Sequence, residues 1–398
     1  MELKREYLDA AFPAGSRGAA AARPGLGHYW KIPGVKIGVA GIVLAALQFA
    51  AMNGLLSSSF VYALGNTLIY AIVAIGFCLL LGYSGLASLG TAGFIGLGSY
   101  TAFYLIQEMG APYSVALLAT LVISIGIGVV VGFISLRIEG IYLAIMTLAL
   151  AEVIRNALMA LKSTIKIDIT NVYLFGVNVN ENAVYLLITF TFILLMLLTA
   201  NLIRSPIGRA MIAMKSSTSA AQAMGVSLMK YRLMAFVIST INAALGGLLY
   251  MLYVRNMTTA TSTLLTLSTS LNILGAVIIG GAKSLWGTAF GTFVIYGLQS
   301  MFLSKIQFFI DNPAFITMVT GVLIIVVVMF FPGGFAQMVV SLRSYFKKKS
   351  VERRLREYGK DSSQRAQAPE PRAQVGEPHR HFDRIVRAAR RARGRQGR

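Results

Sequence analysis

The chain alternates between long apolar stretches and short polar connections from about residue 35 to residue 340. A helix needs roughly 20 mainly apolar residues to cross a bilayer, and ten stretches approach that length. We therefore predict an all-α integral membrane protein with about ten spans. These are Val35–Leu56, Phe60–Leu81, Leu86–Ile106, Tyr113–Leu136, Gly140–Leu161, Ala183–Ile203, Leu233–Val254, Leu264–Gly281, Leu285–Leu303 and Phe315–Phe331.

The third, eighth and ninth of these spans are short or rich in glycine, so each could be broken or re-entrant. The third and the residues just before it contain glycines at positions 82, 85, 90, 93, 96 and 98. A helix of this composition packs closely against its neighbours. The alternative is a broken helix whose freed backbone groups line a solute path. A second small-residue segment, from Ser270 to Gly287, begins within the eighth span and shares the pattern, and the pair suggests an internal repeat.

Charge sets the expected direction of the spans. Lys and Arg gather in the N-terminal arm (1–34), in the connection 204–232 and in the tail (341–398), which holds 18 of the 36. Basic short loops stay in the cytoplasm, so both termini and the connection 204–232 are predicted to be cytoplasmic. The membrane-spanning region is then 35–340, and the tail is predicted to be disordered and associated with the membrane surface.

Composition excludes several classes of function. Hydrophobic residues make up 56% of the chain and charged residues 13%, which is too apolar for a soluble domain. The net charge of +21 is concentrated in the tail, so we expect no nucleic-acid interface. The three histidines lie outside the apolar region and Cys78 is the single cysteine, so neither an intramembrane metal site nor a disulfide is predicted. No removable signal peptide is evident.

Glu152 and Arg155 stand out because they are charged residues inside the fifth span. They lie three residues apart, so they can pair along one helical face. We favour a structural ion pair inside the bundle, with a proton-coupled or solute-contacting site as the alternative.

The connection 204–232 predicts a short surface helix from Ala210 to Met224, opened by Pro206 and Gly208 and closed by Gly225. Ile212, Ala213, Ala220, Ala221 and Met224 would form a small apolar face that fits a groove on a soluble partner. A helix lying in the lipid headgroup layer is the alternative.

Several blocks in this order resemble the permease subunits of branched-chain amino acid ABC importers. They are GYSGLASLGTAGFIGLGSYTA, RIEGIYLAIMTLALAEVIR, SPIGRA, SAAQAMGVSLMKYRLMAFVIS, ALGGLLY, ILGAVIIGGAKSLWGTAFG and FPGGF, between about Gly82 and Phe335. The resemblance implies a coupling loop that docks on an ATPase. Its residues would be Gly208, Arg209, Ala210, Lys215, Ala220, Ala221 and Gly225.

The same resemblance implies the partners and the cargo. We expect separate ABC ATPase subunits, a second related permease subunit, an extracytoplasmic solute-binding protein and the lipid of a prokaryotic inner membrane. The chain itself has no phosphate-binding loop, because GGAKS at 280–284 has alanine where that motif needs glycine, so ATP would be used by the partner subunits and no cofactor bound here. Acidic residues usual in the family's coupling helix are replaced by Thr218 and Gln222.

The predicted solute path is lined by small and polar residues of the glycine-rich spans and of the fifth span. These are Gly82, Tyr83, Ser84, Gly85, Ser88, Gly90, Tyr100, Thr147, Glu152 and Asn272. Branched-chain or other amino acids are the first expectation, with urea or amides, nucleosides and sugars as alternatives. An ion-coupled secondary transporter, a membrane enzyme and a structural or receptor protein are the competing classes; the first would bury more ionisable groups, and the second would need a convergent catalytic set.

Overall fold

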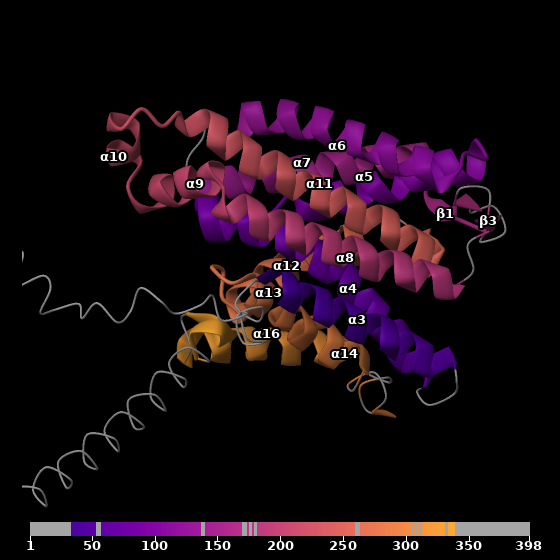
Figure 1. Ribbon diagram of the computed structural model, residues 1–398. Helices are drawn as coiled ribbons and strands as arrows, with labels where there is room; N and C mark the ends of the chain where they lie inside the picture. The colour runs from indigo at the N-terminus through magenta and orange to yellow at the C-terminus, as the bar shows by residue number, and fades with distance from the viewer. Residues whose placement is uncertain are drawn as a thin grey trace, which may run out of the picture. The chain divides into compact units, whose positions relative to one another are not determined.

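The computed structural model describes residues 33–52, 57–136, 140–168, 173–174, 177–178, 181–258, 263–301, 303, 306–307, 309, 313–330 and 333–338. They belong to the first of two compact units, which covers 1–339 (Figure 1). The predicted N-terminal arm and basic tail lie almost wholly outside the described residues.

Helices make up nearly all of the described region. The long ones are α3 (Pro33–Met52), α4 (Ser58–Phe77), α5 (Thr91–Phe103), α6 (Tyr113–Ser135), α7 (Ile141–Leu161), α8 (Glu181–Arg204), α11 (Leu228–Val254), α12 (Leu267–Gly280) and α16 (Pro313–Phe330). Shorter elements are η2 (Cys78–Ser84), η3 (Tyr104–Glu108), α9 (Pro206–Ser216), α10 (Thr218–Ala223), η5 (Thr263–Leu265), α13 (Leu285–Thr292), η6 (Phe293–Gly297) and α14 (Leu298–Met301). An all-α architecture is confirmed.

The centre of this unit is a close crossing of α11 with α4, α5 and α6. A Cβ added at Gly98 would overlap with the carbonyl oxygen of Ala244, and one added at Gly247 would overlap with that of Ile95. Ser99 joins the same two helices, because its hydroxyl donates to the carbonyl of Gly247 at 2.9 Å. Small residues therefore let the backbones of α5 and α11 touch, which is how helices associate in lipid.

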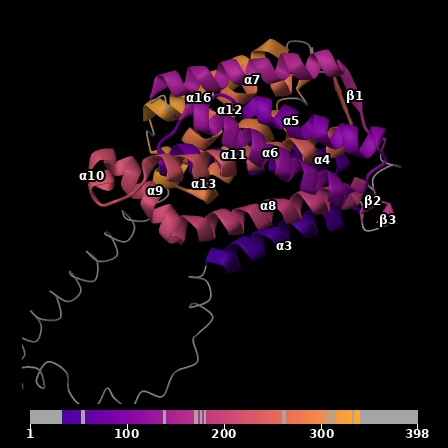
Figure 2. The same cartoon turned by 90° about the horizontal axis from the view of Figure 1, so that it is seen from above.

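Other helices surround this centre. α3 and α8 pack against each other and run side by side along one edge in Figure 2, while α7 packs on α5. Side chains on the outer surface of α6 are apolar, with Leu118 62% exposed and Val122 68% exposed. Such a surface suits contact with lipid tails.

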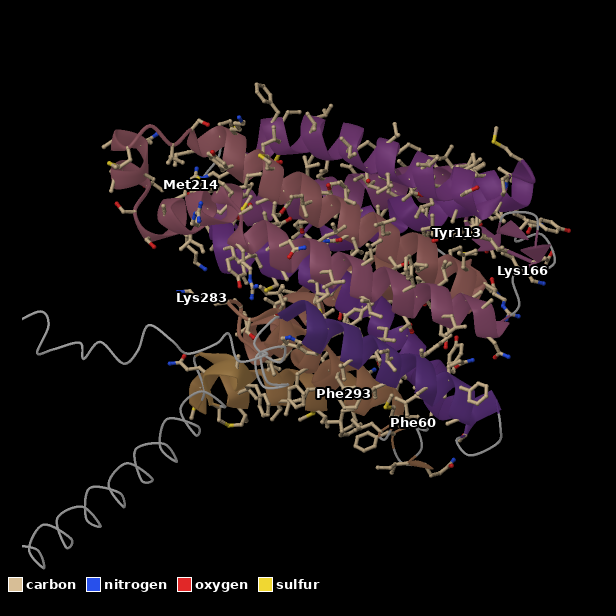
Figure 3. All side chains as sticks on the ribbon, in the orientation of Figure 1. Phe60, Tyr113, Lys166, Met214, Lys283 and Phe293 are labelled. Atoms are coloured by element: carbon tan, nitrogen blue, oxygen red, sulfur yellow. The ribbon has the colours of Figure 1, made fainter. Side chains whose placement is uncertain are left out.

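The helices of this unit share two ends, which we call the α9 end and the β1 end (Figure 1). Met214 and Lys283 lie at the α9 end, whereas Tyr113 and Lys166 lie at the β1 end (Figure 3). At the β1 end, β1 (Thr164–Lys166) pairs antiparallel with β4 (Asn256–Thr258), and β2 (Tyr173–Leu174) pairs with β3 (Val177–Asn178). The sequence did not predict these short strands, which tie α7 to α11 where both helices end.

Five helices in the described part of the chain are long and apolar enough to span a membrane: Ser59–Ser84, Tyr113–Ser135, Ile141–Leu161, Asn182–Arg204 and Leu228–Val254. Three further apolar helices are shorter: Ile37–Ala50, Leu267–Gly280 and Met318–Val327. A multi-pass membrane protein is therefore shown, and the count of ten spans stays a prediction.

The predicted third span begins later than expected. Residues 85–90 are not helical, and α5 starts only at Thr91. Gly85 adopts a left-handed conformation with φ 77° and ends the π-helical turn η2. Glycine carries that conformation without steric cost, so the chain leaves the helix there and enters the bundle as a non-helical segment. The predicted start of this span at Leu86 was therefore wrong by five residues, and a solute path along the segment stays a prediction.

The predicted eighth and ninth spans form a hairpin of α12 with α13. The 14 residues of α12 rise about 21 Å, less than the roughly 30 Å of a bilayer core, so α12 alone is too short to cross. Gly280, Gly287 and Gly291 lie where the two helices touch, since a Cβ at each would overlap with backbone of the facing helix. At the turn, Gly281 has φ 98° and leads into Ser284, whose side chain caps α13.

Candidate functional site

At the α9 end, the turn between α12 and α13 packs against η2. A Cβ at Gly82 would overlap with the carbonyl oxygen of Ala282, so only glycine permits this approach. The hydroxyl of Tyr83 donates to the carbonyl of Lys283 at 2.8 Å. We call Gly82, Tyr83, Ala282 and Lys283 the glycine junction. It joins two glycine-rich segments that are 200 residues apart in sequence.

Lys215 connects the glycine junction to α9. Its ammonium donates to the carbonyl oxygens of Leu81 at 2.9 Å and Gly82 at 2.8 Å, which are unpaired acceptors at the end of a helix. Burial, and next the nearby charge of Lys283, lower the pKa of Lys215. A cation at a helix C-terminus also interacts favourably with the helix dipole. Movement of α9 would therefore pull directly on the end of η2.

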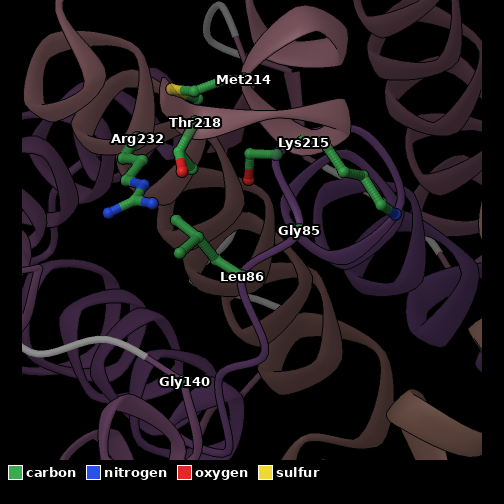
Figure 4. A pocket seen from close by; sticks show the side chains of 8 residues that line it. Gly85, Leu86, Gly140, Met214, Lys215, Thr218 and Arg232 are labelled. Atoms are coloured by element: carbon green, nitrogen blue, oxygen red, sulfur yellow. The ribbon is translucent and has the colours of Figure 1, made fainter. Parts of the chain in front are cut away.

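A cavity of about 330 Å³ lies beside this contact (Figure 4). It lies where α9 and α10 meet the non-helical segment 85–90, which follows η2. Hydroxyl groups and two basic residues contribute to its wall. The lining residues are Ser84, Gly85, Leu86, Gly140, Met214, Lys215, Thr218 and Arg232.

The non-helical segment 85–90 packs against α7. The backbone N–H of Leu89 donates to the hydroxyl of Thr147 at 3.0 Å, and that hydroxyl donates to the carbonyl of Ala144. Gly90 lies against the backbone of Thr147 so closely that a Cβ would not fit without a shift. Ser88 is buried and accepts a bond from the N–H of Gly90. Leu89, Gly90 and Thr147 thus hold the segment before α5 against α7.

The remaining predicted path residues are divided between other places. Tyr100 is buried and donates to the carbonyl of Lys162 at 2.5 Å, so it fastens α5 to the end of α7. Asn272 lies partly exposed in the second turn of α12. Near the start of that helix, Ser270 accepts a bond from the N–H of Ala92 at 3.1 Å. The first turns of α5 and α12 therefore meet inside the bundle.

Glu152 lies apart from all of these residues, on the outer face of α7. It pairs with Arg155, whose Nε and Nη2 donate to the carboxylate at 2.5–3.1 Å, so the predicted ion pair forms. The prediction that it lies within the bundle was wrong for this chain, because 50% of the Glu152 side chain is exposed. The 3.6-residue period turns positions 152 and 156 outward while Ala151 and Leu158 face α5.

The connection 204–232 projects from the α9 end as two helices (Figure 1). Its start is tight, because a Cβ at Gly208 would overlap with the carbonyl of Ile203, and Ser205 caps α9. The prediction of one helix from Ala210 to Met224 was wrong. Ser217 adopts an extended conformation and caps α10 through Ala220, so the chain turns between α9 and α10. Gly225, with φ 80°, ends the second helix.

The apolar face expected on this loop is largely uncovered. Ile212 is 44% exposed and Met224 84% exposed, and Ala213 and Ala220 are exposed as well. Ala221 instead is buried, and Met211 and Met214 anchor α9 to the bundle. Arg209 is exposed at the start of α9 and Ala210 is half-buried. The loop therefore presents a small exposed apolar surface and the exposed, positively charged Arg209.

A family model described as "branched-chain amino acid transport system / permease component" matches residues 59–328. This range holds the helices α4 to α14, the glycine junction and the projecting loop. The chain belongs to this family. Membership agrees with the resemblance carried by the sequence blocks, and the family is one of transport permease components.

Curated relatives agree with the family match. The high-affinity branched-chain amino acid permease protein LivM of Salmonella typhimurium is 28% identical over 250 residues, covering 55% of this chain and 57% of LivM, and LivM of Escherichia coli matches to the same extent. A probable ABC transporter permease, y4mJ of Sinorhizobium fredii, is 35% identical over 30% of this chain and 34% of its own. The chain thus spans under two thirds of the relatives it matches. No solved structure matches it.

Sequence reasoning missed the residues that complete these contacts from distant segments. Ala282 and Lys283 contribute backbone carbonyls to the glycine junction, and the hydroxyl of Ser270 accepts a hydrogen bond from the first turn of α5. Gly140, Met214 and Arg232 line the cavity. The only signal for the junction was the shared glycine pattern of the third and eighth spans, because a backbone carbonyl leaves no mark in a sequence.

Proposed function

We propose that this chain is the membrane-spanning permease subunit of an ABC importer that moves branched-chain amino acids into a prokaryotic cell. The observation that carries the proposal is the projecting α9–α10 loop, which is fastened to the glycine junction through Lys215. A partner bound to this loop would be connected, through Lys215, to η2 and to the turn between α12 and α13. The names of the LivM relatives supply the cargo class.

The partners follow from this assignment. Two ABC ATPase subunits would bind the loops of this chain and of a second related permease subunit, and they alone would bind ATP. A binding protein would deliver the amino acid at the β1 end, and no cofactor, metal or nucleic acid enters the cycle. The Lys and Arg residues of the loop support an orientation in which the α9 end faces the cytoplasm.

The mechanism is alternating access. ATP-driven approach of the ATPases would displace α9 and α10 and, through Lys215, the end of η2 and the α12–α13 turn. Because the packed helices have discrete arrangements, a small shift at the loop can switch the whole bundle between inward-open and outward-open states. The permease supplies a path and no covalent chemistry.

A pull-down with a matched control tests the docking loop. The variant Met224→Glu places a charge on the exposed apolar surface of the loop and is expected to weaken ATPase co-purification at least tenfold and to abolish leucine uptake. Met109→Glu is the control, because Met109 is 74% exposed at the β1 end. ATPase binding that survives Met224→Glu would contradict a docking role for this surface.

Uptake into vesicles separates this function from ion-coupled transport. Leucine accumulation should require ATP and be insensitive to ionophores, whereas a secondary transporter would show the reverse. Competition by isoleucine and valine, but not by urea, nucleosides or sugars, would support the proposed cargo class.

A further inference from the structure

The Glu152–Arg155 pair lies near the middle of the membrane-spanning part of α7. The helix runs from Ile141, next to Gly140 at the cavity of the α9 end, to Leu161, next to β1. Glu152 is the twelfth of its 21 residues, which places it about 16 Å along a rise of about 30 Å. Glu152 therefore lies close to the midpoint of the helix, and Arg155, six residues before Leu161, lies about 9 Å from its β1 end.

This pair is exposed at the surface of the chain. Half of the Glu152 side chain and 21% of the Arg155 side chain are accessible, and Asn156 beside them is exposed. The amide of Asn156 donates to the backbone carbonyl of Glu152 at 2.9 Å and lies 3.5 Å from its carboxylate. Charged residues at this depth face protein or water, because exposure to lipid tails is costly.

The neighbouring helix α6 provides the contrast. Near the middle of α6, the exposed large side chains are those of Val122, Ile123 and Ile125, all apolar. α6 can therefore face lipid, and α7 at the level of Glu152 cannot. An importer has a water-accessible path between two permease subunits, so the exposed face of α7 belongs against that path.

We propose that Glu152, Arg155 and Asn156 form a station that binds the zwitterionic head of an α-amino acid during its passage through the membrane. The proposal rests on the proposed function and names a contact of the solute within it. The carboxylate of Glu152 would receive the solute ammonium, and the guanidinium of Arg155 would receive the solute carboxylate through paired N–H groups.

The surroundings of the pair suit a branched aliphatic side chain. Val153 is 64% exposed, and the nearby exposed positions are Ala149 and Ala157, one turn away, and Ala160, two turns away. Small residues leave room for a solute, and the apolar surface favours an isobutyl or isopropyl group over a charged one. In the resting state the two charges neutralise each other, so an empty station avoids two isolated charges at mid-membrane.

The test uses the complete transporter, reconstituted with its second permease, ATPases and binding protein. Glu152→Gln should lower leucine uptake at least tenfold, while ATPase co-purification and ATP hydrolysis stimulated by the loaded binding protein stay within twofold. Glu108→Gln is the matched control, because Glu108 pairs with Lys162 at the β1 end, and its uptake should change less than twofold. Unchanged uptake by Glu152→Gln would overturn the proposal.

Thiol labelling distinguishes a solute contact from a purely structural contact with the second permease. Cys78 is buried, so the wild-type chain provides the background. Glu152→Cys should react with a charged, water-soluble thiol reagent, and saturating leucine with its binding protein should slow the reaction at least fivefold. Val122→Cys on α6 should react only with a lipid-soluble reagent.

Several outcomes would count against the station. If Glu152→Gln no longer co-purified with the second permease, the pair would be a contact between subunits. If Glu152→Cys were not labelled, or were labelled without protection by leucine, the pair would not bind the solute. If the wild-type transporter moved no amino acid at all, the proposed function would fail instead, independently of Glu152.

Discussion

The crossing of α5 with α11 and the outer face of α6 are both built from apolar and glycine-rich helices, yet their glycines have opposite surroundings. Gly98 and Gly247 meet backbone of the facing helix, whereas a Cβ at Gly126 of α6 would have nothing within 4 Å. Composition alone does not distinguish these positions. What differs is the second helix, and a membrane helix uses small residues where another backbone approaches it.

The largest expected effect is at the crossing itself. Gly247→Val would force apart α11 and the backbone of Ile95, and overpacking against backbone costs more than the roughly 1–3 kcal/mol typical of a flexible core. We expect at least a tenfold loss of folded protein, measured by monodisperse yield in detergent. A normal yield would show that the two helices can separate freely.

The next effect tests whether the core extends to the α9 end. Lys215→Met removes two hydrogen bonds from a charged donor, each worth about 1.5–3 kcal/mol, between α9 and the end of η2. We expect leucine uptake to fall about tenfold while ATP hydrolysis by the assembled transporter continues. Lys283→Met removes a neighbouring charge of the same sign without breaking these bonds, and its uptake should remain near that of the wild type. Equal losses in both variants would attribute the effect to local charge.

A smaller effect is expected for a hydrogen bond between the core helices. Ser99→Ala removes the bond from α5 to the carbonyl of Gly247, and such bonds average about 0.6 kcal/mol in a membrane protein. The thermal unfolding midpoint in detergent should fall slightly. Thr101→Ala serves as the reference, since its hydroxyl bonds only to Leu97 within α5. A shift no larger than that of the reference would refute the contribution of the interhelical bond.

The smallest effect is expected on α6. Gly126→Ala meets open space and removes a residue that weakens helices by roughly 1 kcal/mol relative to alanine. Yield and thermal midpoint should be unchanged or slightly raised. A loss of assembly with an otherwise folded chain would mean that a second permease covers this face, and α6 would then no longer differ from the crossing.

Much of the fold could be predicted because lipid imposes strong local rules. Each predicted span overlaps a helix, since backbone groups in hydrocarbon must be bonded within their own segment. The late start of α5 at Thr91 was not predicted, because glycine permits both helix packing and non-helical chain. The break at Ser217 was missed, since serine can either continue a helix or cap the next one.

The candidate site divides in the same way. Glu152 and Arg155 were predicted to pair from their spacing along one helix, which is a local property. Their exposure depended on which side of α7 packs against α5, and the sequence of α7 did not predict which side that is. Tyr100 and Thr147, which were predicted to line a path, connect α5 and the segment before it to α7 and its end, because a hydroxyl in a membrane bonds to whichever carbonyl or N–H lies closest.

By itself the sequence determined that the chain lives in a membrane, where its helices lie, which loop is basic and to which family it belongs. These depend on apolar length, charge distribution and ordered motifs, all of which are local. Only the tertiary structure decided that Gly82 meets Ala282, that Lys215 caps the end of η2 and that Glu152 faces outward. Those contacts join segments far apart in sequence through backbone atoms that every residue possesses, so only the folded chain can select them.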